Sequence, residues 1–339
     1  MTPPKHILVI RFSSLGDVAM TVPVLKNLLH QYPGVQVTFI SQPFFAPLFR
    51  DIERLHFYPA NVQTDFKGLF GLYRLSRNVR KDISFDAIAD LHGSLRSNLL
   101  RSLLPGTKAV IDKGRQEKKE LTARKNKKLR QLKTTFQRYA EVFEKLGLAV
   151  NLDISTGIRK INPRNELVSF IPDRSTLIGI APFAKHAPKQ YPVSQMQKVV
   201  RILVSTGAGI LLFGSHGEAA VLDQWSVKMQ GVYSLAGKLS FEDELNVISQ
   251  LQLMISMDSA NMHLASLFGI PVVSIWGGTH PFAGFYGWGQ SMDNAVQIAH
   301  PCRPSSVFGN KPCPVHGSTG CMDGITPEMI VDRVNNIYR

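Results

Sequence analysis

Residues 257–265 have the sequence Met-Asp-Ser-Ala-Asn-Met-His-Leu-Ala. The apolar run 251–255 before them predicts a buried strand, and residues 263–268 predict the opening of a helix that stops at Gly269. A second buried strand is predicted over 270–276. The N–H groups at such a strand-to-helix turn suit the phosphates of a nucleotide. On local evidence alone an ordinary helix cap by Asp258 or Ser259 is favoured, because most helices have such caps.

The length and composition indicate two globular domains of the α/β class. A chain of 339 residues exceeds one typical domain, and 44% apolar residues are enough to build proper cores. Only three cysteines occur, all after residue 300, so a disulfide framework is not expected and a reducing cytoplasm is the simplest compartment. No signal peptide is visible, and no apolar run approaches the ~20 residues of a membrane helix.

The formal charge of +14 is concentrated in one stretch, residues 108–138, which carries twelve Lys and Arg side chains against three carboxylates. Nucleic acid, an anionic membrane surface or a phosphorylated substrate would suit such a stretch, and a solvated basic loop is the plain alternative. The stretch has almost no aromatic residues besides Phe136 and, just beyond its end, Tyr139, which argues against a platform for stacking single-stranded bases.

Strand and helix patterns alternate in two series. The first has strands over 5–10, 35–40 and 85–91 and helices over 18–30, 95–103 and 134–146. The second has strands over 176–181 and 209–213 and helices over 193–205 and 218–230, before the strand-helix-strand described above. Residues 151–173 lack periodicity and are interpreted as a linker. We therefore expect two doubly wound domains facing each other across a central cleft.

The turn after the first strand holds Ser13, Ser14, Gly16 and Asp17. Ligands of open α/β sheets bind at that edge, so Asp17 could take a proton from an attacking hydroxyl group. The alternative is an acidic residue that interacts with the helix dipole. The chain has no G-x-G-x-x-G pattern, which removes the main support for an oxidoreductase that binds nicotinamide or flavin.

Charged residues follow three strands of the second series. Lys185 and Lys189 lie after the strand at 176–181, Glu218 after the strand at 209–213, and Asp258 after the strand before residue 257. The lysines could neutralise a diphosphate and Glu218 could accept hydrogen bonds from ribose. Taken singly, a solvated loop and a first-turn glutamate are the alternatives. Taken together, these strand ends describe a nucleotide pocket.

Near the C-terminus, Cys302, Cys313, His316 and Cys321 form the pattern C-x10-C-x2-H-x4-C. A small zinc site is one interpretation. The spacing does not fit the common C-x2–4-C pairs, so we expect reduced thiols and no metal.

Several motifs resemble those of one family. They are Arg-Phe-Ser-Ser-Leu-Gly-Asp at 11–17, Asp-Leu-His-Gly-Ser-Leu-Arg-Ser at 90–97, Lys-Gln-Tyr-Pro at 189–192, Asp-Ser-Ala-Asn-Met-His at 258–263 and Cys-Met-Asp-Gly-Ile-Thr-Pro at 321–327. In this order they resemble the ADP-heptose:lipopolysaccharide heptosyltransferases, glycosyltransferase family 9. The resemblance implies a GT-B fold with two Rossmann-like domains, and inverting, metal-independent glycosyl transfer from a nucleotide-sugar without a cofactor.

The resemblance also implies a division of labour. Residues 1–172 would bind the acceptor and 173–325 the nucleotide-sugar, with ADP-heptose as the expected substrate, while a C-terminal helix in 326–339 would pack back on the N-terminal domain. Asp17 would be the general base. The remaining assignments are, for the donor, Ala184, Lys185, Lys189, Glu218, Lys238, Leu239, Asp258, Ser259, Ala260, Asn261 and His263, and for the acceptor, Arg11, Ser13, Ser14, Gly16, Arg96 and Arg101. The chain departs from the family at Ala260 and Phe183, where Gly is common, and at Tyr191, where Trp is usual.

The acceptor expected from the resemblance is the inner core of lipopolysaccharide, an anionic lipid-linked glycan. The basic stretch 108–138 could recognise its phosphates and carboxylates, with peripheral contact to the anionic inner leaflet. We expect a cytoplasmic monomer that does not bind nucleic acid. The alternative is a basic membrane-surface or nucleic-acid-binding protein with a degenerate nucleotide pocket.

Overall fold

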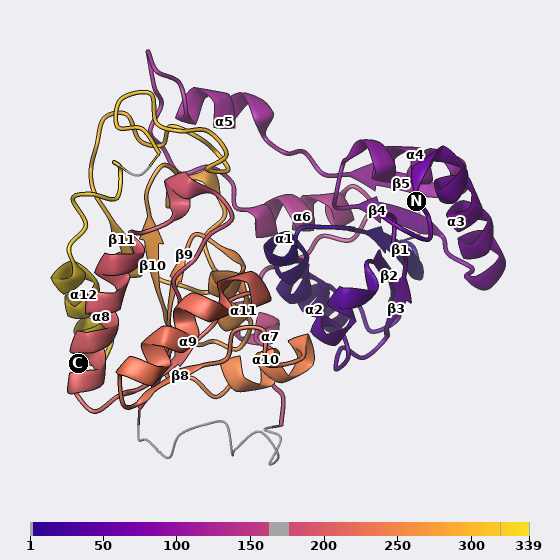
Figure 1. Ribbon diagram of the computed structural model, residues 1–339. Helices are drawn as coiled ribbons and strands as arrows, with labels where there is room; N and C mark the ends of the chain where they lie inside the picture. The colour runs from indigo at the N-terminus through magenta and orange to yellow at the C-terminus, as the bar shows by residue number, and fades with distance from the viewer. Residues whose placement is uncertain (1–2, 163–175, 319, 339) are drawn as a thin grey trace. The chain divides into compact units, whose positions relative to one another are not determined.

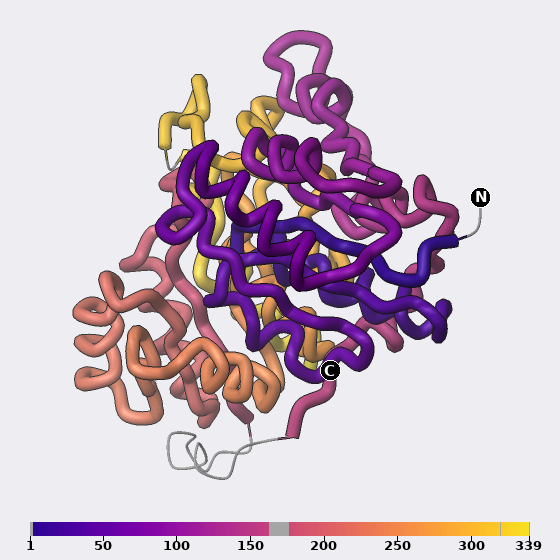
Figure 2. The backbone as a smooth tube through the Cα atoms, turned by 90° about the vertical axis from the view of Figure 1, so that its right-hand side faces the viewer, coloured from indigo at the N-terminus to yellow at the C-terminus, as the bar shows by residue number. Residues whose placement is uncertain are grey.

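The computed structural model describes residues 3–162, 176–318 and 320–338 (Figure 1). The chain divides into two compact units, whose backbones can be followed by colour in Figures 1 and 2. The N-terminal unit contains Met1–Arg115 and Lys133–Ile158, and the C-terminal unit contains Gln116–Leu132 and Arg159–Arg339. The domain boundary expected at 172/173 lies outside the described residues.

The N-terminal unit is a parallel five-stranded sheet with helices. Its strands, in the spatial order β3-β2-β1-β4-β5, are β1 (His6–Ile10), β2 (Gln36–Ser41), β3 (Leu55–Pro59), β4 (Ala87–Asp90) and β5 (Thr107–Val110). Its helices are α1 (Leu15–Ala19), α2 (Thr21–Gln31), α3 (Gly68–Asp82), α4 (Leu95–Leu103), α6 (Thr135–Glu144) and α7 (Ile154–Gly157). The central strands are apolar without alternation because both sheet faces are covered.

The C-terminal unit is a parallel six-stranded sheet. Its strands, in the spatial order β11-β10-β9-β6-β7-β8, are β6 (Leu177–Ala181), β7 (Gly209–Leu212), β8 (Val232–Ser234), β9 (Leu253–Met257), β10 (Val272–Trp276) and β11 (Ala295–Gln297). Its helices are α5 (Arg115–Leu121), α8 (Val193–Ser205), α9 (Ala219–Lys228), α10 (Phe241–Ile248), α11 (Ala260–Leu267) and α12 (Pro327–Tyr338). This order is that of a doubly wound Rossmann sheet, and the fold class expected from the sequence is confirmed.

Local capping signals mark several helix starts. Ser94 caps α4 by accepting a hydrogen bond from the backbone N–H of Ser97, and Thr134 caps α6 in the same way through Gln137. The helix expected over 18–30 is two helices, α1 and α2, that meet at Met20. Strands β3, β5, β8 and β11 and helices α3, α5, α7 and α10 were not predicted.

The last helix, α12, packs against α8 and the β10–β11 side of the C-terminal sheet (Figure 1). Ile330, Val331 and Val334 belong to the hydrophobic core of the same unit. The apolar face of α12 is therefore covered within the C-terminal unit. The packing of the helix in 326–339 on the N-terminal domain stays a prediction.

The segment 151–158 is also more structured than a linker. Asn27 on α2 binds the backbone of Asp153 through both its amide groups, at 2.9 and 3.0 Å, and α7 packs on α2. The crossing into the C-terminal unit therefore comes at Ile158/Arg159, where the backbone N–H of Arg159 donates to the carbonyl of Leu267 at 2.6 Å.

Among the described residues, no helix is both long and apolar enough to cross a membrane.

Candidate functional site

In each sheet the strand order reverses at one place, and ligands of open α/β sheets bind outside the carboxyl ends of the strands at such a place. In the N-terminal unit the reversal lies at the neighbouring strands β1 and β4. The loops that follow them contain residues 11–17 and 91–94. Each predicted catalytic or acceptor residue of this unit lies in these loops or on α4 or the start of α1.

Asp17 lies in the first turn of α1 with its carboxylate held from two sides. The Oδ2 atom lies 2.7 Å from Nη2 of Arg11 and accepts hydrogen bonds from the hydroxyl and the backbone N–H of Ser14, at 2.7 and 3.3 Å. The side chain is still 28% exposed. Asp17 and Ser14 form a capping box at the start of α1. Asp17 is therefore the helix-start acid of the alternative interpretation, and the same contacts hold its carboxylate in the loop after β1.

Arg11 is a buried positioning group in this arrangement. Its Nη1 donates to the carbonyl of Leu91 at 2.7 Å, and its guanidinium lies over the ring of Tyr139. Tyr139 in turn donates its hydroxyl to the backbone carbonyl of Asp17 at 3.1 Å. Arg11 thus links the loops after β1 and β4. Tyr139 was not predicted, because its contact with the site comes from helix α6, far along the chain.

His92 and Lys113 complete the polar surroundings of Asp17. Burial lowers the pKa of His92 to about 4, with Arg11 and Lys113 adding to the effect. The imidazole is therefore neutral near pH 7, and its Nδ1 accepts the N–H of Phe12 at 3.3 Å. Burial and Arg11 also lower the pKa of Lys113. Lys113 follows β5, so the strand-end rule could have found it.

The predicted acceptor residues differ in what holds them. Arg101 is paired with Asp90 at 2.8 Å, and Asp90 is fully buried and also accepts the N–H groups of His92 and Gly93. Arg101 therefore orders the loop after β4. Arg96 is exposed on α4, Ser14 is exposed, and Ser13 and Gly16 are half-buried in the loop after β1.

In the C-terminal unit the strand order reverses at the neighbouring strands β6 and β9. Lys189, in the loop after β6, lies 2.9 Å from Oδ2 of Asp258, in the loop after β9. Asp258 is 5% exposed and Lys189 17% exposed. The two motifs that the sequence placed 69 positions apart are thus joined by a buried ion pair at the switch point.

The start of α11 bears on the choice between a cap and a phosphate site. Ser259 is the N-cap residue, yet its side chain makes no capping hydrogen bond; its hydroxyl lies 3.0 Å from that of Ser256. Ser259, Ala260 and Asn261 are half-exposed. Ala260 is the first helical residue of α11 and its φ is not positive, so the alanine fits where the family commonly has Gly.

Two further loops continue along the same edge, after the neighbouring strands β7 and β8. Glu218 accepts the N–H and hydroxyl of Ser215 through Oε2, at 2.7 and 2.9 Å, as a capping box. Gly237 has φ +66°, and a Cβ there would lie 2.8 Å from Cα of His216, so the two loops touch. Lys238 pairs with Asp223 at 2.8 Å, and Leu239 is half-buried beside it.

The remaining predicted donor residues lie near the switch point. Ala184 and Lys185 belong to the loop after β6, where the N–H of Ala184 faces Oε1 of Gln190 at 3.5 Å and Lys185 is exposed. His263 is buried within α11. In spatial order, the loop after β9 therefore carries Asp258 and the start of α11, and the loop after β6 carries Lys185 and Lys189. The loop after β7 carries Glu218, and the loop after β8 carries Lys238 and Leu239.

The basic stretch divides between the units, because residues 116–132 belong to the C-terminal unit. Within 116–132, Lys118 is 9% exposed over the ring of Phe285, and Lys127 donates to the carbonyls of Cys302 and Pro304 at 2.7 and 2.9 Å. The exposed cations of the same residues are Lys119, Arg124, Lys125, Lys128 and Arg130, of which Lys128 and Arg130 lie 3.1 and 3.9 Å from the carboxylate of Glu120.

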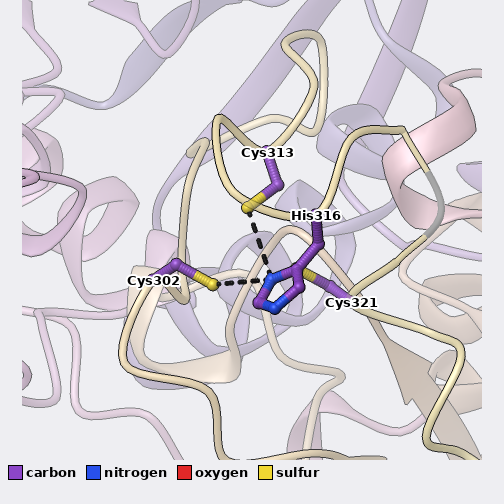
Figure 3. Close-up of side chains that lie close together, drawn as sticks. All are labelled: Cys302, Cys313, His316 and Cys321. Carbon is purple, nitrogen blue, oxygen red and sulfur yellow. Dashed lines mark hydrogen bonds between the residues drawn. The ribbon is translucent and has the colours of Figure 1, made fainter.

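The side chains of Cys302, Cys313, His316 and Cys321, which the sequence spacing did not favour as a metal site, come together in the structure (Figure 3). Their ligand atoms all lie within 4.8 Å of one another.

Comparison with known proteins identifies the family. The model of glycosyltransferase family 9 (heptosyltransferase) matches residues 72–311. The lipopolysaccharide core heptosyltransferase OpsX of Haemophilus influenzae is 23% identical over 317 residues, which cover 87% of this chain and 85% of the relative.

Two solved structures carry the same fold. A glycosyl transferase family 9 protein from Veillonella parvula superposes with a TM-score of 0.74 at 17% identity, covering 98% of this chain and 97% of the other. The E. coli heptosyltransferase WaaC with ADP-2-deoxy-2-fluoro heptose superposes with a TM-score of 0.68 at 18% identity, covering 98% and 99%. The GT-B architecture inferred from the resemblance is therefore confirmed, and the chain, an enzyme of glycosyl transfer, belongs to glycosyltransferase family 9, the heptosyltransferases.

Proposed function

We propose that this protein is an inverting, metal-independent heptosyltransferase that moves a heptose from ADP-heptose to the inner core of lipopolysaccharide. The observation that carries the proposal is the edge of the C-terminal sheet, where Lys189 and the start of α11 meet at the switch point. The family match and the ADP-sugar named with the E. coli neighbour support this choice of donor.

The donor would lie along the four loops in the order of their strands. Lys189, with Lys185 nearby, and the N–H groups of Ser259, Ala260 and Asn261 would bind the diphosphate, since an uncapped helix start favours anions. Asp258 would hold Lys189 in place. Glu218 keeps its Oε1 for ribose hydroxyls, because its capping bonds use Oε2.

The remaining donor assignments follow from position. Lys238 and Leu239 would lie beside the adenine, and Ala184 would contribute a backbone contact near the phosphates. His263, which is buried in α11, would act by supporting the helix start and not by direct contact.

The chemistry needs one displacement at the anomeric carbon. Asp17 would accept the proton of the attacking acceptor hydroxyl, whose oxygen forms the new bond to that carbon from the face opposite the diphosphate. The bond from the anomeric carbon to the diphosphate oxygen then breaks, and ADP leaves with the electron pair. Lys189 and the α11 N–H groups would stabilise its charge in place of a metal ion.

On the acceptor side, Arg11 and Ser14 would orient Asp17, while Ser13, Ser14 and the backbone at Gly16 would bind acceptor hydroxyls. Arg96 is exposed and is the better candidate for an acceptor phosphate, because Arg101 is paired with a buried carboxylate.

The exposed cations of the basic stretch would contact the anionic acceptor and the inner leaflet that holds it. Replacing Lys119, Arg124 and Lys125 by Gln should weaken sedimentation with phosphatidylglycerol vesicles and raise the KM for acceptor. The matched control removes the same charge from α3 (Arg77, Arg80 and Lys81). Equal loss with both triple variants would refute a specific role for the stretch.

Asp17→Asn tests the proposal directly, with the exposed Asp51→Asn as control. Sugar transfer should fall by roughly 10²–10⁴-fold in Asp17→Asn, the range of a lost general base, while ADP still raises the unfolding temperature. At a hundredfold excess over its Kd, ADP should raise the free energy of unfolding by about 2.7 kcal/mol relative to the protein without nucleotide. UDP, GDP and CMP at the same concentration should raise it less. Three results would contradict the proposal. They are sugar transfer that persists in Asp17→Asn, sugar transfer that requires added Mg²⁺, and a larger increase in unfolding temperature with UDP than with ADP.

A further inference from the structure

Residues 298–326 join β11 to α12 without a helix or strand among those described. Loops this long are uncommon unless something other than secondary structure orders them. Cys302, Cys313 and Cys321 are the only cysteines of the chain, and all three lie in this segment with His316. We propose that the four side chains bind one structural zinc ion.

The geometry of the ligand atoms fits a tetrahedral ion. The Nδ1 atom of His316 lies 3.2 Å from Sγ of Cys302, 3.8 Å from Sγ of Cys313 and 4.0 Å from Sγ of Cys321. A tetrahedral zinc with Zn–S near 2.3 Å and Zn–N near 2.0 Å places S and N about 3.5 Å apart. Figure 3 shows the four side chains converging from different parts of the loop.

Two of the ligands come from one tight turn. The backbones of Cys313 and Gly317 exchange two hydrogen bonds of 2.9 Å, and Gly317 has φ +69°, which closes the turn.

The other two ligands are anchored by the surrounding protein. Cys302 precedes Arg303, whose buried guanidinium donates to the carbonyls of Trp276 and Thr279 at 3.1 and 2.9 Å. Cys321 is 3% exposed and precedes the fully buried Met322. The ligands are thus brought together by packing as well as by the turn.

The surroundings also balance the charge. Three thiolates, a neutral imidazole and Zn²⁺ together carry one negative charge. Lys127 of the basic stretch donates from its ammonium group to the carbonyl of Cys302. A second cation, Arg303, directly follows Cys302 in the sequence. Four protein ligands leave no open position, which is the pattern of a structural and not a catalytic zinc. Zinc is favoured over redox metals because a closed set of sulfur and imidazole ligands is its usual site.

The loop supports the Lys189 region. The N–H of Ser305 donates to the carbonyl of Gly278 at 2.9 Å, and the N–H of Gly278 donates to the carbonyl of Pro188 at 2.8 Å. Gly309 is so close to Lys189 that a Cβ there would lie 2.4 Å from its side chain. Loss of zinc should therefore loosen the position of Lys189. This consequence for the donor rests on the proposed function, whereas metal binding itself does not.

The first test is the metal content of the full-length chain. It is expressed with zinc and iron supplied, purified without chelators or a polyhistidine tag, and analysed by mass spectrometry for metals. One zinc per chain is expected, with all three thiols protected from a thiol reagent until zinc is removed. A chain without metal, with a disulfide, or with iron in place of zinc would overturn the proposal.

Variants identify the ligands. Cys313→Ser and Cys321→Ser should lose most of the zinc, while His316→Cys should retain it, because a fourth thiolate replaces the imidazole. The matched control is His300→Phe, whose ring lies 4.7 Å from that of His316 but which is not one of the four ligands. Zinc retained in Cys313→Ser, or lost equally in His300→Phe, would refute the assignment.

A spectroscopic readout does not depend on the stability of the variants. The wild-type chain loaded with Co²⁺ in place of zinc should show the visible bands of a tetrahedral ion and sulfur-to-cobalt charge transfer. A six-coordinate spectrum would overturn the proposal. Removing zinc should raise the Kd for ADP several-fold. If the protein binds one zinc per chain but its Kd for ADP is the same with and without zinc, only the link to the donor loop is refuted.

Discussion

The buried pair of Lys189 and Asp258 allows stability to be separated from donor binding. At an effective dielectric constant of about 20, charges 2.9 Å apart attract by about 6 kcal/mol, most of which offsets the cost of burying them. Lys189→Met leaves a carboxylate that is 5% exposed without its cation. Removing one partner of a buried pair costs about 3–5 kcal/mol, and we expect about 3 kcal/mol because Lys189 keeps some contact with water.

Removing both charges should restore most of that stability. In Lys189→Met/Asp258→Asn neither charge is left buried, so the free energy of unfolding should return to within about 1 kcal/mol of the wild-type value. Asp258→Asn alone should cost less than Lys189→Met, because the lysine can turn toward water. The four proteins form a double-mutant cycle that measures the coupling of the pair.

The assay can report on the C-terminal unit alone. All three tryptophans, Trp225, Trp276 and Trp288, lie in that unit, so tryptophan fluorescence in urea follows its unfolding. A loss of about 3 kcal/mol corresponds to a decrease in Tm of roughly 6–12 °C for a unit of this size. An unchanged unfolding midpoint in Lys189→Met would refute the buried-pair reasoning.

Donor binding should follow a different pattern from stability. Both variants without Lys189 lose a charge-assisted bond to the diphosphate, worth about 1.5–3 kcal/mol, so the Kd for ADP should rise roughly 10–100-fold. Calorimetry at a temperature where all four proteins are folded measures this. If the double variant binds ADP like the wild type, Lys189 is not a phosphate ligand.

Three further predictions concern single residues. Arg101→Met should destabilise the N-terminal unit by about 3 kcal/mol, because it leaves Asp90 buried without its cation, and hydrogen exchange of β4 and α4 should detect this; an effect on acceptor KM alone would contradict it. Since the pKa of His92 is lowered to about 4, the unfolded chain binds a proton before the folded one as pH falls from 6.5 to 4, and stability decreases in that window. His92→Asn should flatten this decrease by up to about 2 kcal/mol in thermal unfolding at several pH values; an unchanged slope would contradict it. Gly237→Ala would place a Cβ 2.8 Å from Cα of His216 on a backbone with φ +66°. It should lower the free energy of unfolding by about 1–2 kcal/mol and raise the Kd for ADP. An unchanged ADP affinity in calorimetry would exclude a role of this contact in donor binding.

The loops at both switch points could be predicted because they follow apolar strands. A parallel sheet brings the carboxyl ends of its strands to one edge, so local patterns and the resemblance were enough to select Asp17, Lys189 and Asp258 as candidates. Residues such as Tyr139 could not be found in this way, since they reach the site from elements far along the chain.

The sequence by itself determined the alternation of strands and helices and the residues at the strand ends, because these depend on periodicity and capping within a few positions. Only the tertiary structure decided which charges are engaged, as with Arg101 on Asp90 and Lys118 over Phe285. It also decided that α12 and residues 116–132 pack in the C-terminal unit, and that three cysteines and a histidine with an unusual spacing converge on one point. These outcomes depend on long-range packing, which no local pattern in the chain records.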